Sequence, residues 1–408
     1  LRDGGRVWGP AVQLYTLRSQ HNWGIGDFGD LERLAGQMAA QGADIIGLNP
    51  LHAMFTHNPA HASPYSPSSR RQLNVWYIDV PAVSDFAQCE EARQRVATPE
   101  FQQRLARLRQ LPLVDYPGVA AAKLEILRLL YAFFAQHHLQ ADGSAADDHG
   151  QAFVEFVAHQ GAALREHALF EAIQSHLHAQ DASVWGWPMW PARLQDPHGA
   201  AVQDFAREHA DAVRFHQYLQ WQAARQLARI RNNCAQWGMG VGLYLDLAVS
   251  ADRAGSDCWS HQECFTAHAS VGAPPDEFNP AGQGWGLPAL RPDRLRHDRY
   301  RLFIDTVRSA MGSAGALRID HVMGLMRLYW IPGGHSARDG AYVHYALDEM
   351  LAIVALESQR NRCMVIGEDL GTVADAMREA LARHDVLSYR LLYFERTGDG
   401  GFRAPAQY

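Results

Sequence analysis

The stretch AVQLYTLRSQHNWGIGDFGDLERLAGQMAAQGADIIGLNP, residues 11–50, decides which fold class the sequence favours. Its first residues, Ala11–Leu14, form a short apolar run, and DIIGL at 44–48 forms a second one. Between the two runs, apolar residues recur at helical spacing at Leu31, Leu34 and Met38, and Gly42 marks the expected end of the helix. Strand, helix and strand in this order form a βαβ unit, whose two strands pair in parallel.

The three glycines of NWGIGDFGDL, residues 22–31, match G-x-G-x-x-G, the phosphate-binding pattern of dinucleotide folds. In such folds the glycines follow the first strand almost at once, and an acidic residue ends the second strand. Here residues 15–23 intervene, and the nearby acidic residue, Asp44, begins the second strand. We therefore expect a βα loop with tight turns, in which Asp27 or Asp30 caps the helix, and no nucleotide.

Further apolar strands, most of them followed by a helical pattern, recur towards the end of the chain. They are expected at 240–249, 316–322, 364–370 and 389–394, with helices near 298–311, 343–358 and 373–383. Six β segments with polar residues at their C-terminal ends are typical of a (β/α)8 TIM barrel in the α/β class. A doubly wound parallel sheet is the alternative.

The residues from about 83 to 235 interrupt this rhythm with helical patterns rich in Ala, Leu, Gln, Glu and Arg. We predict three parts: 1–82 as the first part of the barrel, 83–235 as a large helical insertion, and 236–408 as the barrel's continuation. The continuation reaches about the sixth strand, so the predicted barrel is truncated at the C-terminal end of this chain.

Composition excludes several classes of protein. The chain has 408 residues, of which 47% are hydrophobic, and a formal net charge of −7, whereas nucleic-acid-binding proteins usually carry a basic stripe. No stretch approaches the roughly 20 apolar residues of a membrane-spanning helix, and the five cysteines form no C-x-x-C pair. We expect a cytoplasmic protein with reduced thiols that binds neither nucleic acid nor membrane.

The segment ALRIDHVMG offers the sharpest catalytic candidates. Arg318 and Asp320 are two residues apart on a predicted strand, so their side chains share a face. The arginine's charge should lower the pKa of Asp320, and an ionised, positioned carboxylate is a nucleophile or a metal ligand. His321 follows at the strand's end. A structural ion pair between the arginine and the aspartate is the alternative.

The segment VIGEDLG places Glu368 and Asp369 at the end of another apolar strand. Because adjacent carboxylates repel each other, one of them is a candidate for a raised pKa and for general acid catalysis. A helix cap is the alternative for one of the two. Glu368 lies 48 residues after Asp320, which is the length of one βαβ unit. The two residues should therefore end neighbouring parallel strands, which lie about 4.8 Å apart. This spacing allows the separation of roughly 5–5.5 Å that is found between the two carboxyl groups of retaining glycosidases. Asp246 ends an earlier strand in the same way.

Two aromatic residues in loops are candidates for stacking on a sugar. Tyr65 lies between two prolines in SPYSPSSRR (63–71), and Trp285 lies between glycines in GQGWGLP (282–288). A P-x-x-P ligand and a packing plug are the respective alternatives. A metal site built from His57 and His61, with His52 nearby, is disfavoured because a proline interrupts any helix there, so we expect no metal.

Together, ALRIDHVMG, VIGEDLGTV, SPYSPSSRR, NWGIGDFGDL and VQLYTLRS resemble the 4-α-glucanotransferases called amylomaltases or disproportionating enzymes, glycoside hydrolase family 77. The bacterial maltodextrin-pathway type is the most similar, and the resemblance runs over essentially the whole chain. It implies a retaining (β/α)8 enzyme without a cofactor, with Asp320 as nucleophile and Glu368 as acid/base. It also implies that maltooligosaccharides bind near six further residues: Tyr65, Asp246, Trp285, Arg318, His321 and Asp369.

The resemblance has one departure. The family's third catalytic carboxylate, an aspartate in a Thr-His-Asp motif, has no match, and the expected N-terminal extension and last barrel strands are missing with it. We therefore expect this chain to be a fragment of a longer enzyme. A catalytically incomplete glucan-binding fragment and a hydrolase of the α-amylase clan are the alternatives to a transferase. The sequence does not indicate an oligomeric state.

Overall fold

A computed structural model describes residues 5–277, 279–371 and 373–404. Its main sheet has six parallel strands in the order β1-β2-β5-β8-β11-β12. Their bounds are Ala11–Val12, Ile45–Leu48, Gly242–Leu247, Ala316–Ile319, Met364–Gly367 and Leu387–Ser388. The order of the strands across the sheet is also their order along the chain. A doubly wound sheet would instead reverse its strand order at one point. The observed order is the arrangement of a barrel wall, so the competing fold class is excluded.

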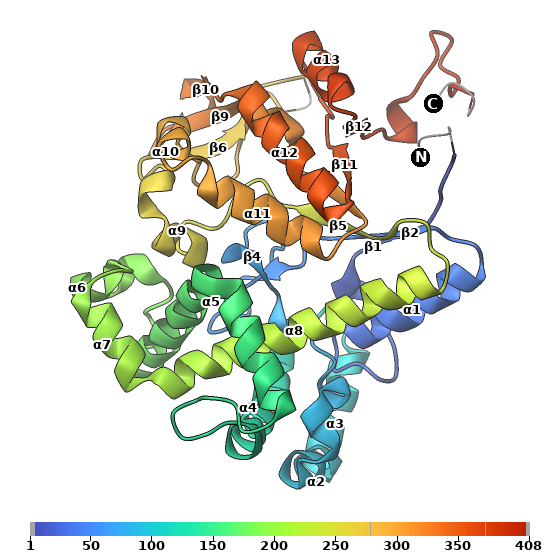
Figure 1. Ribbon diagram of the computed structural model, residues 1–408. Helices are drawn as coiled ribbons and strands as arrows, with labels where there is room; N and C mark the ends of the chain where they lie inside the picture. Colours follow the sequence, from blue (N-terminus) through green and yellow to red (C-terminus); the bar gives the residue numbers. More distant parts are fainter. Residues whose placement is uncertain (1–4, 278, 372, 405–408) are drawn as a thin grey trace.

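The helices of the barrel cover the outside of this sheet (Figure 1). α1 (Phe28–Ala40) follows β1, α11 (Arg301–Gly312) precedes β8, α12 (Leu347–Asn361) precedes β11, and α13 (Asp375–Arg383) precedes β12. α11 packs against α12. Short helices α9 (Ser256–Ser260) and α10 (Pro292–His297) lie in the connection after β5. The predicted helices at 298–311, 343–358 and 373–383 are therefore present, with shifted ends.

In the first βα unit, two aspartates cap the helix and two glycines form the turns before and after it. Asp27 caps α1 by accepting a hydrogen bond from the Asp30 backbone N–H, and the Asp30 side chain accepts one from Asp27 N in return, so both predicted caps take part. Gly42 ends the helix at a φ of +81°. Gly24 has a φ of +90°, and a Cβ there would lie 2.6 Å from the Cβ of Leu108, so the tight turn needs glycine.

The sixth strand is displaced from its predicted position. The sequence predicted a strand over 389–394, but β12 is Leu387–Ser388 and residues 392–394 form the 3-10 helix η9 (Leu392–Phe394). Pairing with β11 ends at Ser388, and the three side chains of η9 are exposed. An apolar run without a neighbouring strand to pair with does not extend the sheet.

Two smaller sheets were not predicted. An antiparallel sheet has the order β10-β9-β6-β7, formed by Ala341–His344, Arg327–Pro332, Ala269–Ala273 and Gln283–Gly284. A hairpin pairs β3 (His52–Ala53) with β4 (Ser69–Leu73). Both lie in connections that follow strands of the main sheet, where a barrel builds its functional loops.

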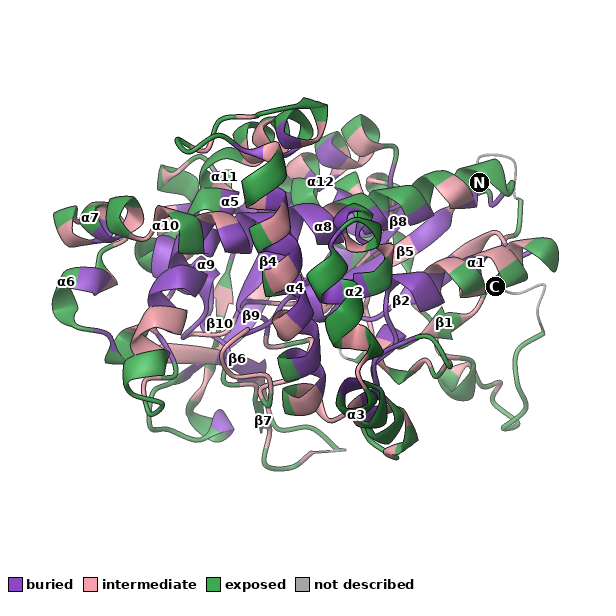
Figure 2. Cartoon of the chain, turned by 90° about the horizontal axis from the view of Figure 1, so that it is seen from below, coloured by how far each residue is buried: buried purple, intermediate pink, exposed green. Residues whose placement is uncertain are grey.

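The stretch 83–235 contains the helices α2 to α7 and most of α8. Their bounds are Glu90–Ala97, Pro99–Gln110, Tyr116–His138, Asp148–Gln180, Ala192–Gln195, Ala200–Glu208 and Ala210–Gln236. α8 packs against α1 and β5, and Figure 2 shows buried residues running from the strands into α8. The helices α2, α3, α4 and α8 and the first part of α5 share one hydrophobic core with the barrel, whereas α6, α7 and the later part of α5 pack in a second cluster. The division at residues 83 and 235 stays a prediction.

One buried lysine ties the helical stretch to the barrel. Lys123 on α4, the only lysine in the sequence, is fully buried and donates to the backbone oxygens of Trp76 and Ile78 at 2.8 and 2.6 Å. Its Nζ also lies 3.5 Å from the Asp27 carboxylate that caps α1. Burial lowers the pKa of Lys123 and raises that of Asp27, and each charge opposes the other's shift.

Candidate active site

The predicted catalytic residues meet where strands β5, β8 and β11 end. Asp246 is in β5 and pairs in register with Arg318 of β8. Asp320 follows β8, and its N–H donates to Leu247 O at 3.0 Å; Glu368 follows β11, and its N–H donates to Ile319 O at 3.0 Å. Because the carboxyl ends of parallel strands lie on one side of the sheet, these side chains share one face, the face that carries active sites in barrel enzymes.

Arg318 joins two of the carboxylates. Its Nη1 donates to Asp246 Oδ1 at 2.7 Å, and its Nη2 lies 2.8 Å from Asp320 Oδ1. The second oxygen of Asp246 accepts a hydrogen bond of 3.0 Å from the Tyr65 hydroxyl. The guanidinium carbon also lies 5.5 Å from the ring centre of Tyr389. Arg318 therefore fixes the orientation of Asp320 and leaves its Oδ2 outside this ion pair.

The pKa of Asp320 is shifted in the direction opposite to the sequence prediction. The arginine was expected to lower it, but burial raises the pKa of Asp320 by more than Arg318 lowers it, and nearby Glu368 raises it further. Burial likewise raises the pKa of Asp246 to about 6, against the opposing charge of Arg318. Burial disfavours charge on Arg318 itself, yet its two carboxylate partners leave its pKa raised. The degree of burial, which the sequence pattern does not report, decides the sign.

Glu368 is held by the backbone on both oxygens. Its Oε2 accepts from the His321 N–H and its Oε1 from the Leu370 N–H, each at 3.0 Å. His321 has a φ of +47°, a left-handed conformation that is rare for a residue with a side chain and is often found at active sites. The backbone turns at His321 in this conformation, and the turn directs the His321 N–H at Glu368 Oε2. Its ring packs edge-on against Trp285 with centroids 5.2 Å apart, and burial lowers its pKa.

Five of the eight predicted site residues line one cavity of about 730 Å³: Tyr65, Trp285, Asp320, His321 and Glu368. Asp246 and Arg318 do not line the cavity. Asp246 contacts the lining residue Tyr65, and Arg318 contacts the lining residue Asp320. Asp369 is also outside the lining. It accepts from the Ser388 hydroxyl at 2.6 Å and from Tyr389 N–H at 3.0 Å, so it ties the end of β11 to the residues of and after β12. Neither acidic residue caps α13, which has Ala374 at its N-cap, so that alternative is excluded.

The loop that carries Tyr65 is fixed by polar contacts. Ser66 Oγ donates to Asp252 Oδ2 at 2.8 Å, and His61 Nε2 lies 3.3 Å from the same oxygen. The three histidines considered for a metal do not converge among the described residues, since His52 accepts from Ala248 N–H and His57 contacts the backbone oxygen of Trp185. The Tyr65 side chain is thus held with 42% of the residue exposed.

The sequence analysis missed the far wall of the cavity. Met323 and Met326 follow β8, and Tyr329 and Tyr342 come from the antiparallel strands β9 and β10. Residues 274–276, in the loop between β6 and β7, complete the wall on that side; this part was not missed, because the family resemblance implied that the loop 271–284 covers the cleft. The pattern RLYWIP could have indicated a strand by its aromatic and β-branched residues, but nothing in it indicates a partner 50 or more residues earlier.

Comparisons with known proteins place the chain among carbohydrate enzymes. A family model described as 4-alpha-glucanotransferase matches residues 12–408. The chain is 42% identical over 401 residues to a 4-alpha-glucanotransferase of Haemophilus influenzae, and 40% identical over 409 residues to one of Mycobacterium tuberculosis. The alignments cover 97% and 98% of this chain but 57% and 54% of those proteins, so the chain spans little more than half their length.

Solved structures give the same result for the fold. The crystal structure of amylomaltase from Corynebacterium glutamicum matches with a TM-score of 0.82 and 32% identity, over 97% of this chain and 52% of that one. Amylomaltase from Streptococcus agalactiae in complex with acarbose matches with a TM-score of 0.78 over 97% of this chain and 75% of that one. At 18% identity the second likeness concerns the fold alone. The predicted barrel-type α/β fold class is confirmed.

Proposed function

We propose that this chain, which belongs to glycoside hydrolase family 77, the 4-alpha-glucanotransferases, forms the catalytic face of a transferase that moves α-1,4-glucan segments between maltooligosaccharides. The observation that carries the proposal is the position of Asp320 and Glu368, which end the paired strands β8 and β11 and line the same cavity. Retaining glycosidases and transglycosidases use two such carboxyl groups, one as nucleophile and one as general acid and base.

In the proposed reaction Asp320 attacks the anomeric carbon of the donor while Glu368 protonates the departing glycosidic oxygen. The bond from the anomeric carbon to that oxygen breaks, and a β-linked ester to Asp320 forms. In the second step Glu368 removes the proton from the 4-hydroxyl of an acceptor glucan, whose oxygen displaces Asp320. Two inversions give net retention. Arg318 acts as the positioning residue that holds Asp320 by its Oδ1.

The remaining residues have proposed roles in binding. Tyr65 and Trp285 offer ring faces to glucose units, and His321, which packs against Trp285, lines the subsite of the reacting sugar. Asp246 supports Tyr65 and Arg318. Asp369 has an indirect role in this proposal. Its oxygens accept hydrogen bonds from residues 388 and 389, so it positions the end of β12 rather than contacting the substrate.

The cavity lining favours transfer over hydrolysis. Met323, Met326 and Leu287 give it an apolar wall, and the prolines at 274 and 275 extend that wall along the loop between β6 and β7. An apolar cover excludes water from the glycosyl ester, while a bound acceptor glucan presents its hydroxyl in a fixed position. A hydrolase of the α-amylase clan remains the second candidate, since it would use the same two carboxylates.

Maltotriose distinguishes the two candidates. Full-length protein incubated with maltotriose is expected to produce a ladder of longer glucans together with glucose and maltose, because each transfer breaks one linkage and makes another. The concentration of reducing ends should stay nearly constant, because transfer to a glucan hydroxyl replaces each linkage that is broken. If reducing ends rise by one for each linkage broken, the protein is a hydrolase; if glucans bind without turnover, it is a binding protein.

We further propose that the protein works in the cytoplasm on maltodextrins. The five described cysteines are all buried and unpaired, as expected for a reducing compartment. Among the described residues there is no helix with the length and apolar character needed to cross a membrane.

Tyr65→Phe is expected to move the acidic limb of the pH–activity profile. Asp246 must be ionised to hold Arg318, so activity should fall as the pH drops through about 6, the pKa to which burial raises Asp246. The Tyr65 hydrogen bond lowers that pKa. Its removal should therefore move the limb to higher pH by about one unit, the equivalent of one charge-assisted hydrogen bond.

The matched control is Tyr342→Phe, the same change at a tyrosine that lines the same cavity. Profiles of kcat/KM against pH with maltotriose should show the wild-type limb for the control. An unmoved limb in Tyr65→Phe, or an equal shift in both variants, would contradict the role given to the contact between Tyr65 and Asp246.

A further inference from the structure

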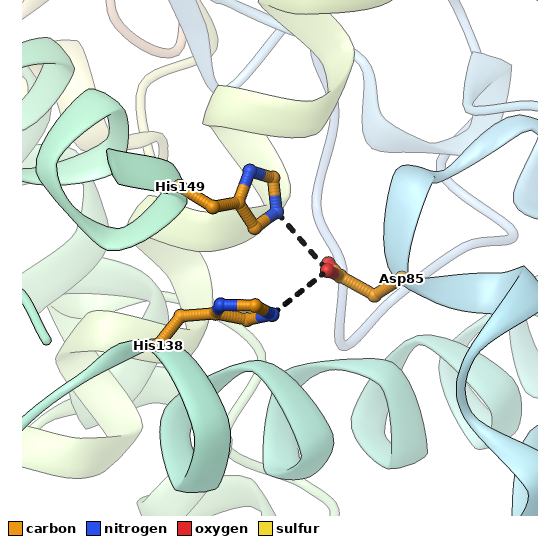
Figure 3. Close-up of side chains that lie close together, drawn as sticks. All are labelled: Asp85, His138 and His149. Carbon is orange, nitrogen blue, oxygen red and sulfur yellow. Dashed lines mark hydrogen bonds and ion pairs between the residues drawn. The ribbon is translucent and has the colours of Figure 1, made fainter. Parts of the chain in front are cut away.

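A second group of polar side chains lies in the helical stretch and does not line the cavity of Asp320 and Glu368. Asp85 belongs to the 3-10 helix η4 (Ser84–Ala87), His138 is the last residue of α4, and His149 is the second residue of α5. Figure 3 shows both imidazole rings directed at the same carboxylate. Asp85 Oδ1 lies 3.0 Å from His149 Nε2 and 3.7 Å from His138 Nε2.

We propose that Asp85, His138 and His149 bind one zinc ion. The donor set is two imidazole nitrogens and one carboxylate oxygen, which suits Zn²⁺ with a water molecule as fourth ligand. Calcium and magnesium prefer oxygen ligands, so this set disfavours them. The sequence analysis expected no metal and did not consider these three residues, which come from segments that only the fold brings together.

The spacing of the ligand atoms is close to that of a tetrahedral zinc site. With metal–ligand bonds of about 2.0–2.2 Å, two ligand atoms of a tetrahedron lie about 3.4 Å apart. The two separations from Asp85 Oδ1, 3.0 and 3.7 Å, lie on either side of this value, and all three ligand atoms are within 4.8 Å of one another. Side-chain movements of less than an ångström would place all three around one ion.

The hydrogen bonds of the surrounding residues orient His138 as a ligand. Its Nδ1 lies 2.6 Å from Asp147 Oδ2, and that carboxylate can only accept, so Nδ1 carries the proton. The other ring nitrogen, Nε2, faces Asp85 Oδ1 at 3.7 Å and is the atom that would bind the metal. A carboxylate behind a zinc-binding imidazole is a recurrent arrangement. Asp147 is itself fixed, because its Oδ1 caps α5 by accepting from Gly150 N–H at 2.8 Å.

Packing holds the other ligands. The Tyr218 hydroxyl donates to Asp85 Oδ2 at 2.8 Å, which leaves Oδ1 for a single bond to the metal. The His149 ring packs against Trp221 and Phe134 with centroids 5.1 and 5.5 Å apart. The Asp85 side chain is 2% exposed and that of His149 is 24% exposed, so an ion can enter from the His149 side. The Ser84 hydroxyl also lies 3.3 Å from His149 Nε2 and is the group an entering ion would displace.

Such an ion would join η4 to the ends of α4 and α5 and close the loop between these helices. Its expected effect is on stability, because metal that binds only the folded state raises the melting temperature. The active-site residues do not take part. The proposal therefore stands or falls independently of the proposed function.

Calorimetric titration of chelator-treated, full-length protein with ZnCl2 tests the proposal. We expect one saturable zinc ion per chain, with the affinity lowered more than about 100-fold in His149→Gln and by about 10- to 100-fold in Asp147→Asn, which keeps all three ligands. His137→Gln is the matched control, because its ring faces away to the backbone oxygen of Phe133. Zinc affinity equal in wild type and His149→Gln would overturn the proposal, as would the absence of saturable binding.

Diffraction by zinc-soaked crystals of the wild-type protein decides the case even if the variants do not fold. An anomalous peak measured at the zinc absorption edge is expected between Asp85, His138 and His149. Zinc peaks only elsewhere would instead assign the group as hydrogen-bonded side chains that hold no metal, and would overturn the metal site.

Discussion

Replacing Asp320 by Asn is expected to abolish glucan transfer by the full-length protein. An amide cannot form the glycosyl ester, so kcat/KM for maltotriose should fall by about 10⁴-fold or more, as happens when a covalent nucleophile is removed. That factor corresponds to about 5.5 kcal/mol of transition-state stabilisation. The amide is the same size as the carboxylate and keeps one oxygen beside Arg318 Nη2, so the cavity should keep its shape.

Two measurements separate this loss from a folding defect. The variant should still bind a maltooligosaccharide with a dissociation constant within about threefold of the wild-type value, because most of the glucan contacts other residues. Asp305→Asn is the matched control: it makes the same change on α11, the helix before β8, where the side chain is 39% exposed. Wild-type-like turnover of Asp320→Asn would overturn the assignment of the nucleophile.

The sequence predicted the strands in the interior of the main sheet. β2, β5, β8 and β11 are short apolar runs, and such runs form strands when neighbours pair with them on both sides, as here. The run at 389–394 is also largely apolar, yet its pairing with β11 ends with the hydrogen bond from Tyr389 N–H to Gly367 O. Whether a run of apolar residues has a strand to pair with depends on the rest of the chain, and local sequence does not contain that information.

The contacts of the site could be predicted from the sequence where both residues lie close together in the chain. Arg318 and Asp320 share a face by spacing alone, and the structure pairs them. The contact of Tyr65 with Asp246 joins residues 181 positions apart, and only the sheet brings them together. The sign of the Asp320 pKa shift depends on burial, which opposes the charge of Arg318, so the sequence prediction was wrong there. The cluster at Asp85 escaped prediction for the same reason as the contact of Tyr65.

Replacing Glu368 by Gln is expected to make activity depend on the leaving group of the donor. With maltotriose, whose sugar leaving group needs a proton, kcat should fall by about 10²- to 10⁴-fold. With α-maltosyl fluoride, whose leaving group needs none, the ester to Asp320 should form at a rate near that of the wild type. The ester should then accumulate, because no base is left to activate the acceptor hydroxyl, and intact-protein mass spectrometry would detect the added maltosyl group.

Azide tests the second half of this argument, because it is a nucleophile that carries no proton. It should release the trapped sugar of Glu368→Gln as α-maltosyl azide, the anomer expected after two inversions. The glutamine keeps only one acceptor oxygen for the N–H groups of His321 and Leu370, so part of the loss with maltotriose comes from altered positioning. That part should be the same for every donor, and the dependence on the leaving group isolates proton transfer. Glu379→Gln, the same change at an exposed residue of α13, is the control. An equal loss with maltotriose and with the fluoride, or a β-azide, would remove Glu368 from the acid/base role.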